Sequence, residues 1–188
     1  TVGLLPGSRT AEIQKLLPEM MKAAEIISRR IPEVHYILPL ADTLNQGDVE
    51  RIISAAKIPV RIVPGRTCDV LAACDLAIVT SGTATLETGL MGVPMVIIYK
   101  LSLFSAIIGR LFINPRHIGL VNIIAGRTVA PELIQLDATG ARIAAEALAI
   151  LQNESKKQAM IADLAAIRER LGEPGAARRA AQIACDML

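Results

Sequence analysis

The feature that most constrains the fold is a regular alternation of short apolar runs with helix-compatible segments. The apolar runs predict strands at residues 2–5, 34–38, 59–63, 75–79 and 94–99. The segments between them predict helices at residues 10–30, 49–56, 69–74 and 84–91. Because strands and helices alternate with short connections, the sequence predicts an α/β fold whose parallel sheet carries helices on both faces.

The last third of the chain lacks strand-like runs and is expected to be helical. Three helices are predicted there, at residues 139–151, 154–171 and 174–187. We therefore divide the chain into a sheet domain, residues 1–138, and a C-terminal helical extension, residues 139–188. The sequence leaves open whether this extension packs on the sheet domain or on a domain outside the given sequence.

Composition narrows the function classes. Aromatic residues make up only 2% of the 188 residues and the formal net charge is +2, which argues against a nucleic-acid partner. Cys68, Cys74 and Cys185 lack metal-ligand spacing, and their odd number fits buried free thiols in a reducing cytosol. No signal peptide is visible and no apolar run is long enough to span a bilayer. Because the chain starts directly with a strand, we expect the second half of a longer protein.

Loops that follow the predicted strands are the first candidates for a binding site, because they lie together at the carboxyl edge of a parallel sheet. They cover residues 6–9, 39–42 and 80–83. In the first loop, Gly7 allows a close backbone approach beside Ser8, and the forked guanidinium of Arg9 suits phosphate oxygens. The alternative is that Arg9 is a surface residue at a helix cap. The loop is neither a Walker motif nor a G-x-G-x-x-G fingerprint, which argues against NAD.

The loop after residues 75–79 is built from small residues and leads directly into a helix. Backbone N–H groups of such a loop lie at the positive end of the helix dipole, which suits a diphosphate. The hydroxyls of Ser81 and Thr83, on either side of Gly82, can donate to a ligand or cap the helix. The carboxylate of Glu87 can accept two hydrogen bonds, which matches the vicinal hydroxyls of a ribose. A plain strand-to-helix turn, with Glu87 favouring the dipole, is the alternative.

Polar residues also stand out within the otherwise apolar segment 121–127. Asn122 and Arg127 lie there, close to Gly126. A buried polar side chain needs a hydrogen-bond partner. That partner is either a bound ligand or a backbone carbonyl, and the sequence does not decide between the two.

Taken in order, these motifs resemble those of the lipid-A-disaccharide synthase family. They are Pro-Gly-Ser-Arg-x-x-Glu from Pro6, Ser-Gly-Thr-Ala-Thr-Leu-Glu from Ser81, and Asn-x-x-Ala-Gly-Arg-x-x-x-Pro-Glu-x-x-Gln from Asn122. One departure is Val121, where the family usually has proline before the asparagine. The resemblance implies a bacterial inverting glycosyltransferase of the GT-B type, which has two Rossmann-like domains. This chain resembles the C-terminal, nucleotide-binding half.

The resemblance also implies a reaction, partners and a place in the cell. The family joins UDP-2,3-diacylglucosamine to 2,3-diacylglucosamine 1-phosphate and releases UDP, which forms lipid A disaccharide 1-phosphate for lipopolysaccharide. The N-terminal half would supply the catalytic base and most of the acceptor site, so we expect the isolated chain to be inactive. The protein is expected to be cytoplasmic and peripherally associated with the inner membrane, and homo-oligomerisation stays open.

Carried over residue by residue, the resemblance gives the motifs their roles. Glu87 would hold the ribose, within a UDP-binding set of Gly7, Ser8, Ser81, Gly82, Thr83, Glu87 and Gln135. The residues expected near the reacting sugar phosphate are Arg9, Asn122 and Arg127. The sequence contains no Asp-x-Asp motif, so neither a metal nor another cofactor is expected. His35, expected within a strand, would be structural, whereas His117 lies in a basic loop that can contact a phosphate.

A membrane contact is expected within residues 88–131, a segment without acidic residues. Its residues 101–113 form an apolar, helix-compatible stretch that is too short to cross a bilayer. Rimmed by Lys100, Arg110 and Arg116, this stretch would suit the headgroup boundary of an anionic leaflet. The alternative is a helix packed against the sheet, with its basic neighbours solvated or facing the UDP phosphates.

Two other functions stay open. One is a different UDP-sugar enzyme of the same architecture, such as an N-acetylglucosamine transferase or a UDP-N-acetylglucosamine 2-epimerase. An epimerase needs acid and base residues in the cleft, and these loops offer few of them. The other is a nucleotide-sugar-binding module without catalysis.

Overall fold

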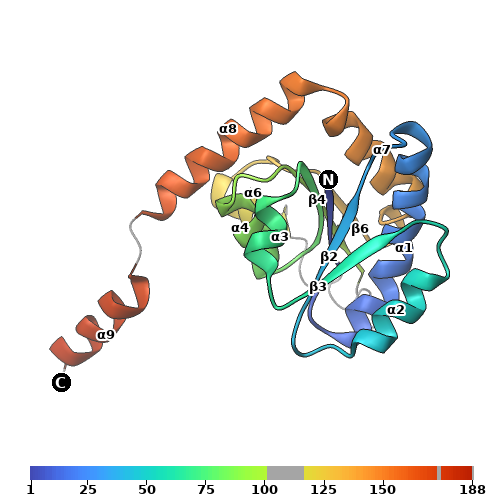
Figure 1. Ribbon diagram of the computed structural model, residues 1–188. Helices are drawn as coiled ribbons and strands as arrows, with labels where there is room; N and C mark the ends of the chain where they lie inside the picture. Colours follow the sequence, from blue (N-terminus) through green and yellow to red (C-terminus); the bar gives the residue numbers. More distant parts are fainter. Residues whose placement is uncertain (101–116, 173–174, 188) are drawn as a thin grey trace.

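The computed structural model describes residues 1–100, 117–172 and 175–187. At its centre is a parallel sheet, and the strands found in these ranges have the order β3-β2-β1-β4-β5-β6 (Figure 1). They are β1 Val2–Leu5, β2 Tyr36–Leu40, β3 Val60–Pro64, β4 Leu76–Thr80, β5 Met95–Tyr99 and β6 Glu132–Ile134. The expected α/β fold with a parallel sheet is confirmed.

Strand ends differ slightly from the expected ones because pairing between strands sets them. β2 begins at Tyr36, which pairs with the first residue of β1, whereas the expected start was Val34. His35 therefore precedes the strand and is exposed, so its expected place within a strand was wrong. β2 also continues through Pro39, which lacks an N–H. Its ladder to β1 ends at Ile37, and beyond that point only β3 is paired with it.

Helices cover both faces of the sheet, as expected (Figure 1). Their bounds are α1 Thr10–Arg30, α2 Gln46–Ser54, α3 Thr67–Ala72, α4 Thr83–Leu90, α6 Leu120–Ala125, α7 Gly140–Leu151 and α8 Glu154–Leu171. On one face α1 packs against α2 and α7, and on the other α4, α6 and α8 pack together. The short elements β6 and α6 have no counterpart in the expected pattern, because three and six residues are too few to show a period.

The C-terminal helices differ in their contacts. α7 packs along α1, and α8 packs against α4 and α6, so both lie on the sheet domain. α9, Ala176–Asp186, instead extends away from the sheet (Figure 1). The side chains of residues 177–187 are exposed.

A close contact between Glu19 and Gly140 joins α1 to α7. A Cβ on Gly140 would lie 2.5 Å from Cβ of Lys22, so only glycine allows the helices to approach this closely. The Gly140 N–H donates to Glu19 Oε2 at 2.8 Å, and the ammonium groups of Lys22 and Lys100 lie 3.2 and 3.3 Å from Glu19 Oε1. Burial alone would raise the pKa of Glu19. The three donors outweigh burial, so that this pKa lies below its ordinary value.

The cysteines are less buried than expected. Cys68 and Cys185 are exposed, and Cys74 is half-buried with its thiol donating to Val70 O at 3.0 Å. Burial raises the pKa of Cys74 to about 11. This thiol is therefore protonated and poorly nucleophilic at neutral pH.

Candidate functional site

The strand order creates a topological switch point between β1 and β4. From β1 the chain adds β2 and β3 on one side, then crosses back to add β4, β5 and β6 on the other. At such a point the connections leave in opposite directions and a crevice opens beyond the carboxyl ends of the strands. A cavity of about 470 Å³ lies there, lined by residues 5–9, 12, 39, 41, 67, 80–84 and 87.

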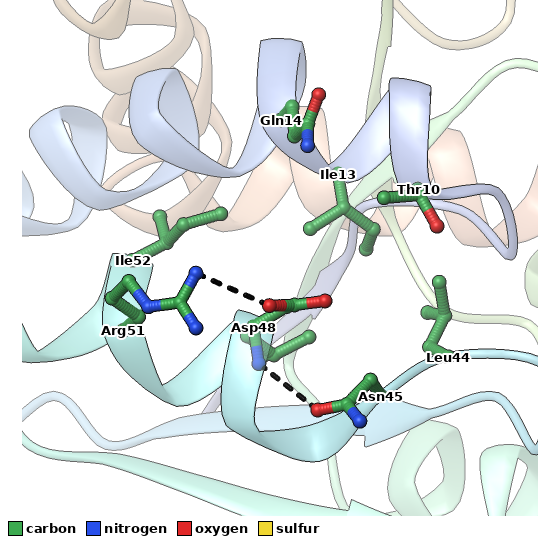
Figure 2. A pocket seen from close by; sticks show the side chains of 9 residues that line it. Thr10, Ile13, Gln14, Leu44, Asn45, Asp48, Arg51 and Ile52 are labelled. Carbon is green, nitrogen blue, oxygen red and sulfur yellow. Dashed lines mark hydrogen bonds and ion pairs between the residues drawn. The ribbon is translucent and has the colours of Figure 1, made fainter.

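A smaller hollow of about 130 Å³ lies between α1 and α2 (Figure 2). Three of its polar residues, Asn45, Asp48 and Arg51, already interact with one another. The N–H of Asp48 donates to Asn45 Oδ1 at 3.3 Å, and Arg51 Nη1 lies 3.2 Å from Asp48 Oδ1. Because these groups serve the start of α2, the larger cavity at the switch point is the candidate site.

Gly7 brings the loop after β1 close to the opposite wall of the cavity. Its φ is +105°, and a Cβ there would overlap the carboxylate of Glu12 and lie 3.2 Å from Thr80 Cγ2. The side chain of Arg9, at the start of α1, is 80% exposed, and its Nη1 lies 3.3 Å from Glu12 Oε1. Such an exposed pair is weak, so the guanidinium can turn towards an anion in the cavity.

The loop after β4 presents the N-terminus of α4 to the same cavity. Gly82, just before the helix, has a φ of +143°, and apart from its chain neighbours no described residue has an atom within 4 Å of the place where its Cβ would stand. Gly82 has no side chain to cap α4, and Thr83 and Ala84 of the first turn line the cavity. The first N–H groups of a helix carry its positive partial charge, so this wall suits a bound anion.

Glu87 lies one turn further along α4, exposed and lining the cavity. Among the residues that the structure describes, no hydrogen-bond or ion-pair partner contacts its carboxylate. Two hydrogen bonds from a ligand can therefore be accepted there. Around this cavity the fold gathers most of the expected site residues, namely Gly7, Ser8, Arg9, Ser81, Gly82, Thr83 and Glu87.

Two hydroxyls of the loop after β4 already have partners within the fold. Ser81 Oγ donates to Ile118 O at 2.8 Å, so Ser81 braces the loop as well as lining the cavity. Thr85 Oγ1 donates to Gly82 O at 2.8 Å and accepts from Leu120 N at 3.1 Å. The loop is therefore tied to the segment that begins α6.

Glu12 and Thr80 line the cavity, although neither was expected in the site. Thr80 is only 4% exposed, and its hydroxyl has no hydrogen-bond partner among the residues that the structure describes. Its place as the last residue of β4 was the signal that could have pointed to it, because ligands gather at strand ends. Glu12 ends the first of the three motifs, and that place in the motif was the signal that could have pointed to it.

Asn122 lies outside the cavity lining and is fully buried. Its Oδ1 accepts from the N–H groups of Val129 and Ala130 at 2.7 and 2.9 Å. Its Nδ2 donates to Ala130 O at 2.8 Å and to Glu132 Oε1 at 2.7 Å. The hydrogen-bond partners of Asn122 therefore lie within the chain, which was the alternative to a bound ligand. The structure does not bring Asn122 to the cavity.

Arg127 and Gln135 also lie outside the cavity lining. Arg127 forms two hydrogen bonds of 2.5 and 2.9 Å with the carboxylate of Asp163 on α8, which raises the pKa of Arg127. Gln135, directly after β6, has a φ of +55°, and its buried side-chain Nε2 has no partner in the described part of the chain. Backbone strain and an unpaired polar group often mark functional positions.

The expected membrane surface is described only at its start. Lys100 lies 3.3 Å from Glu19, whereas residues 101–116, with Arg110 and Arg116, lie outside the described residues. In the part of the chain that is described, no helix is both long enough and apolar enough to cross a bilayer. Nor do the described His, Cys, Asp and Glu side chains form a group of three or more that could hold a metal ion.

A parallel sheet with this strand order, and a cavity at its switch point, define a Rossmann-like domain of the GT-B type. A solved structure of similar fold is the UDP-GlcNAc 2-epimerase from Neisseria meningitidis bound to UDP-GlcNAc. It superposes with a TM-score of 0.56 at 12% identity, over 91% of this chain and 44% of its own. At this identity the likeness concerns the fold alone.

Sequence comparison identifies the family. The model of the family described as lipid-A-disaccharide synthetase matches residues 1–187. Lipid-A-disaccharide synthases of Syntrophus aciditrophicus and Nitrosococcus oceani are 51% and 50% identical to this chain over its full length. The chain covers 49% and 48% of those proteins, so it spans about half the length of these curated relatives. The chain belongs to the lipid-A-disaccharide synthetase family.

Proposed function

We propose that this chain is the UDP-sugar-binding half of a lipid-A-disaccharide synthase, an inverting hexosyltransferase of lipopolysaccharide biosynthesis. The whole enzyme would join UDP-2,3-diacylglucosamine to 2,3-diacylglucosamine 1-phosphate and release UDP. The cavity at the switch point carries the proposal. A glycine turn and an exposed arginine meet there with a helix terminus and a carboxylate that have no side-chain cap and no partner among the described residues. Family membership favours this reaction over epimerisation or binding without turnover.

The cavity offers separate places for the two ends of a nucleoside diphosphate. The first turn of α4, at Thr83 and Ala84, supplies N–H groups for the diphosphate. Glu87 follows Thr83 by four positions on the same helix face, which is a rise of roughly 6 Å. We place the ribose hydroxyls at Glu87, because a carboxylate can accept both of their hydrogen bonds.

The same groups would stabilise the departing UDP. Breaking the bond between sugar and diphosphate leaves negative charge on the diphosphate, and donors that are already in place stabilise it most effectively. The N–H groups at the N-terminus of α4 are such donors, and the exposed guanidinium of Arg9 can turn towards the same charge. We expect no metal, because the sequence lacks an Asp-x-Asp motif. The base that activates the acceptor hydroxyl is expected in the other half of the protein, and the roles of Arg127 and Gln135 stay predictions.

Calorimetric titration of the 188-residue chain with UDP tests the proposal. Glu87→Ala removes a charged acceptor and should weaken binding by about 1.5–3 kcal/mol, roughly tenfold or more. The control is Glu50→Ala, since Glu50 is exposed on α2, lies outside the cavity lining, and accepts a hydrogen bond from Gln46 Nε2 of the same helix. Absence of UDP binding by the folded wild type would refute the proposed function.

A second titration, with 2′-deoxy-UDP, tests the place of the ribose. Wild type should bind UDP more tightly than 2′-deoxy-UDP, because Glu87 accepts a hydrogen bond from the 2′-hydroxyl. Glu87→Ala should bind the two nucleotides equally. If the preference for UDP survives in Glu87→Ala, the ribose contacts another residue.

A further inference from the structure

We propose that Glu132 is a positioning residue for the UDP site. With Asn122 it would hold residues 118–120 against the loop after β4, and so fix the wall formed by Ser81 and Gly82. Neither Glu132 nor Asn122 lines the cavity, so both would act through other residues. The inference rests on the proposed function, because the wall in question is the one assigned to the diphosphate.

The carboxylate of Glu132, at the start of β6, collects three donors. Its Oε2 accepts from Ile118 N at 2.9 Å, and its Oε1 accepts from Gly119 N at 3.0 Å and from Asn122 Nδ2 at 2.7 Å. Gly119 precedes α6, and it has no side chain that could cap this helix. Glu132 therefore holds the backbone of the two residues that precede α6, near the positive end of this helix, where a negative charge is favourable.

Asn122 joins this carboxylate to the segment that leads into β6. Its Oδ1 accepts from the N–H groups of Val129 and Ala130, and its Nδ2 bonds both Ala130 O and Glu132 Oε1. Asn122 is fully buried. Flipping its amide would place its NH₂ group against two backbone N–H donors and its oxygen against two oxygen acceptors. The first turn of α6 and the start of β6 are thus held in one arrangement.

Three hydrogen bonds carry this arrangement to the cavity wall. Ser81 Oγ donates to Ile118 O at 2.8 Å. Leu120 N donates to Thr85 Oγ1 at 3.1 Å, and Thr85 Oγ1 donates to Gly82 O at 2.8 Å. Apart from the chain neighbours of Gly82, no atom of the described residues lies within 4 Å of where its Cβ would stand. Hydrogen bonds hold this turn instead: the N–H groups of Ser81 and Thr85 donate to Ile98 O and Gly82 O at 3.0 and 3.1 Å, and the bonds to residues 118–120 add to these.

A double-mutant cycle in UDP affinity tests this route. Glu132→Gln keeps the side-chain length, and its amide nitrogen cannot accept from a backbone N–H. We expect UDP affinity to fall by about fivefold to tenfold. In a Ser81→Ala/Thr85→Val background, which lacks both connections to residues 118–120, the same substitution should change affinity by less than about twofold. Glu50→Gln is the matched control and should change nothing in either background.

Amide hydrogen exchange distinguishes positioning from a general effect on stability. In Glu132→Gln, the amides of Ser81 and Leu120 should exchange faster, whereas those of Ile78 and Val79 in the buried strand β4 should change little. Uniform acceleration, or additive losses of affinity in the two backgrounds, would overturn the inference. If Glu132→Gln does not fold, Glu132→Asp keeps the charge with a shorter reach and is measured in the same way. If wild type folds without binding UDP, the proposed function fails, and the exchange pattern alone decides this inference.

Discussion

Thr80 and Thr85 are two buried threonines in one short stretch, and their hydroxyls differ in one respect. Within the described ranges Thr80 Oγ1 has no hydrogen-bond partner, whereas Thr85 Oγ1 donates to Gly82 O and accepts from Leu120 N. Valine has nearly the shape of threonine without the hydroxyl. We predict that the same substitution, Thr→Val, shifts the stability of the chain in opposite directions at the two positions.

The magnitudes follow from these contacts. A buried hydroxyl without a partner costs about 1–3 kcal/mol, so Thr80→Val should raise the free energy of unfolding by roughly that amount. Thr85→Val removes two hydrogen bonds and leaves the N–H of Leu120 without its acceptor. It should therefore lower the free energy of unfolding by about 1–3 kcal/mol. For a chain of this size 1 kcal/mol corresponds to roughly 2–4 °C in Tm, so the two variants should differ by about 5–20 °C.

Thermal unfolding followed by far-UV circular dichroism measures the difference, since the chain has no Trp for fluorescence. Thr80→Ser and Thr85→Ser serve as controls, because they remove the methyl and keep the hydroxyl. If Thr80→Val lowers Tm as much as Thr85→Val does, the reasoning is wrong. The Thr80 hydroxyl would then be hydrogen-bonded in the folded state, for example to a water molecule in the cavity.

The remaining predictions concern acid stability, catalysis and the membrane. The folded-state pKa of Glu19 lies below its unfolded value, so its stabilising contribution is present above about pH 4.3 and is lost as the pH falls through the folded pKa. Glu19→Gln should accordingly lose less stability than wild type between roughly pH 5 and pH 2 in acid titrations, and identical curves would contradict this. The purified chain should form no disaccharide from the two acylated sugars, because an inverting displacement needs a base and an acceptor held in line; measurable product would show the other half to be dispensable. In flotation with anionic vesicles at low salt, wild type should float and Lys100→Glu/Arg110→Glu/Arg116→Glu should not, since each basic residue near the surface contributes about 1 kcal/mol. Equal flotation would exclude this surface as the membrane contact.

The long elements could be predicted because each carries its own local pattern. α1 repeats apolar residues at helical spacing over its whole length, and β4 is a continuous apolar run. The ends of β2 could not be predicted, because they depend on which residue of β1 lies opposite. The pairing of β6 with β5 joins segments that are far apart in the sequence, and three residues carry too little pattern to reveal it.

The location of the cavity could be predicted for a different reason. The rule that ligands bind at the carboxyl edge needs only the order of the elements along the chain. The partners of individual side chains could not be predicted in this way. Ser81 bonds Ile118 and Thr85 bonds Leu120 across 37 and 35 positions of sequence, and nothing in the local sequence separates these hydroxyls from that of Thr80. Asn122 could be expected only to have a partner of some kind.

The charges around the cavity give its two ends different chemistry. Glu12 lines the cavity near Gly7, and its carboxylate lies 3.3 Å from Arg9 Nη1, so the positive charge of Arg9 is partly offset where a diphosphate is proposed. Attraction for the diphosphate then depends chiefly on the N–H groups at the start of α4, which are fixed in direction. Glu87, one turn away, repels an anion and accepts from hydroxyls. A ligand that suits both ends must carry a diphosphate and a diol at a set separation, so inorganic phosphate alone satisfies only half of this site.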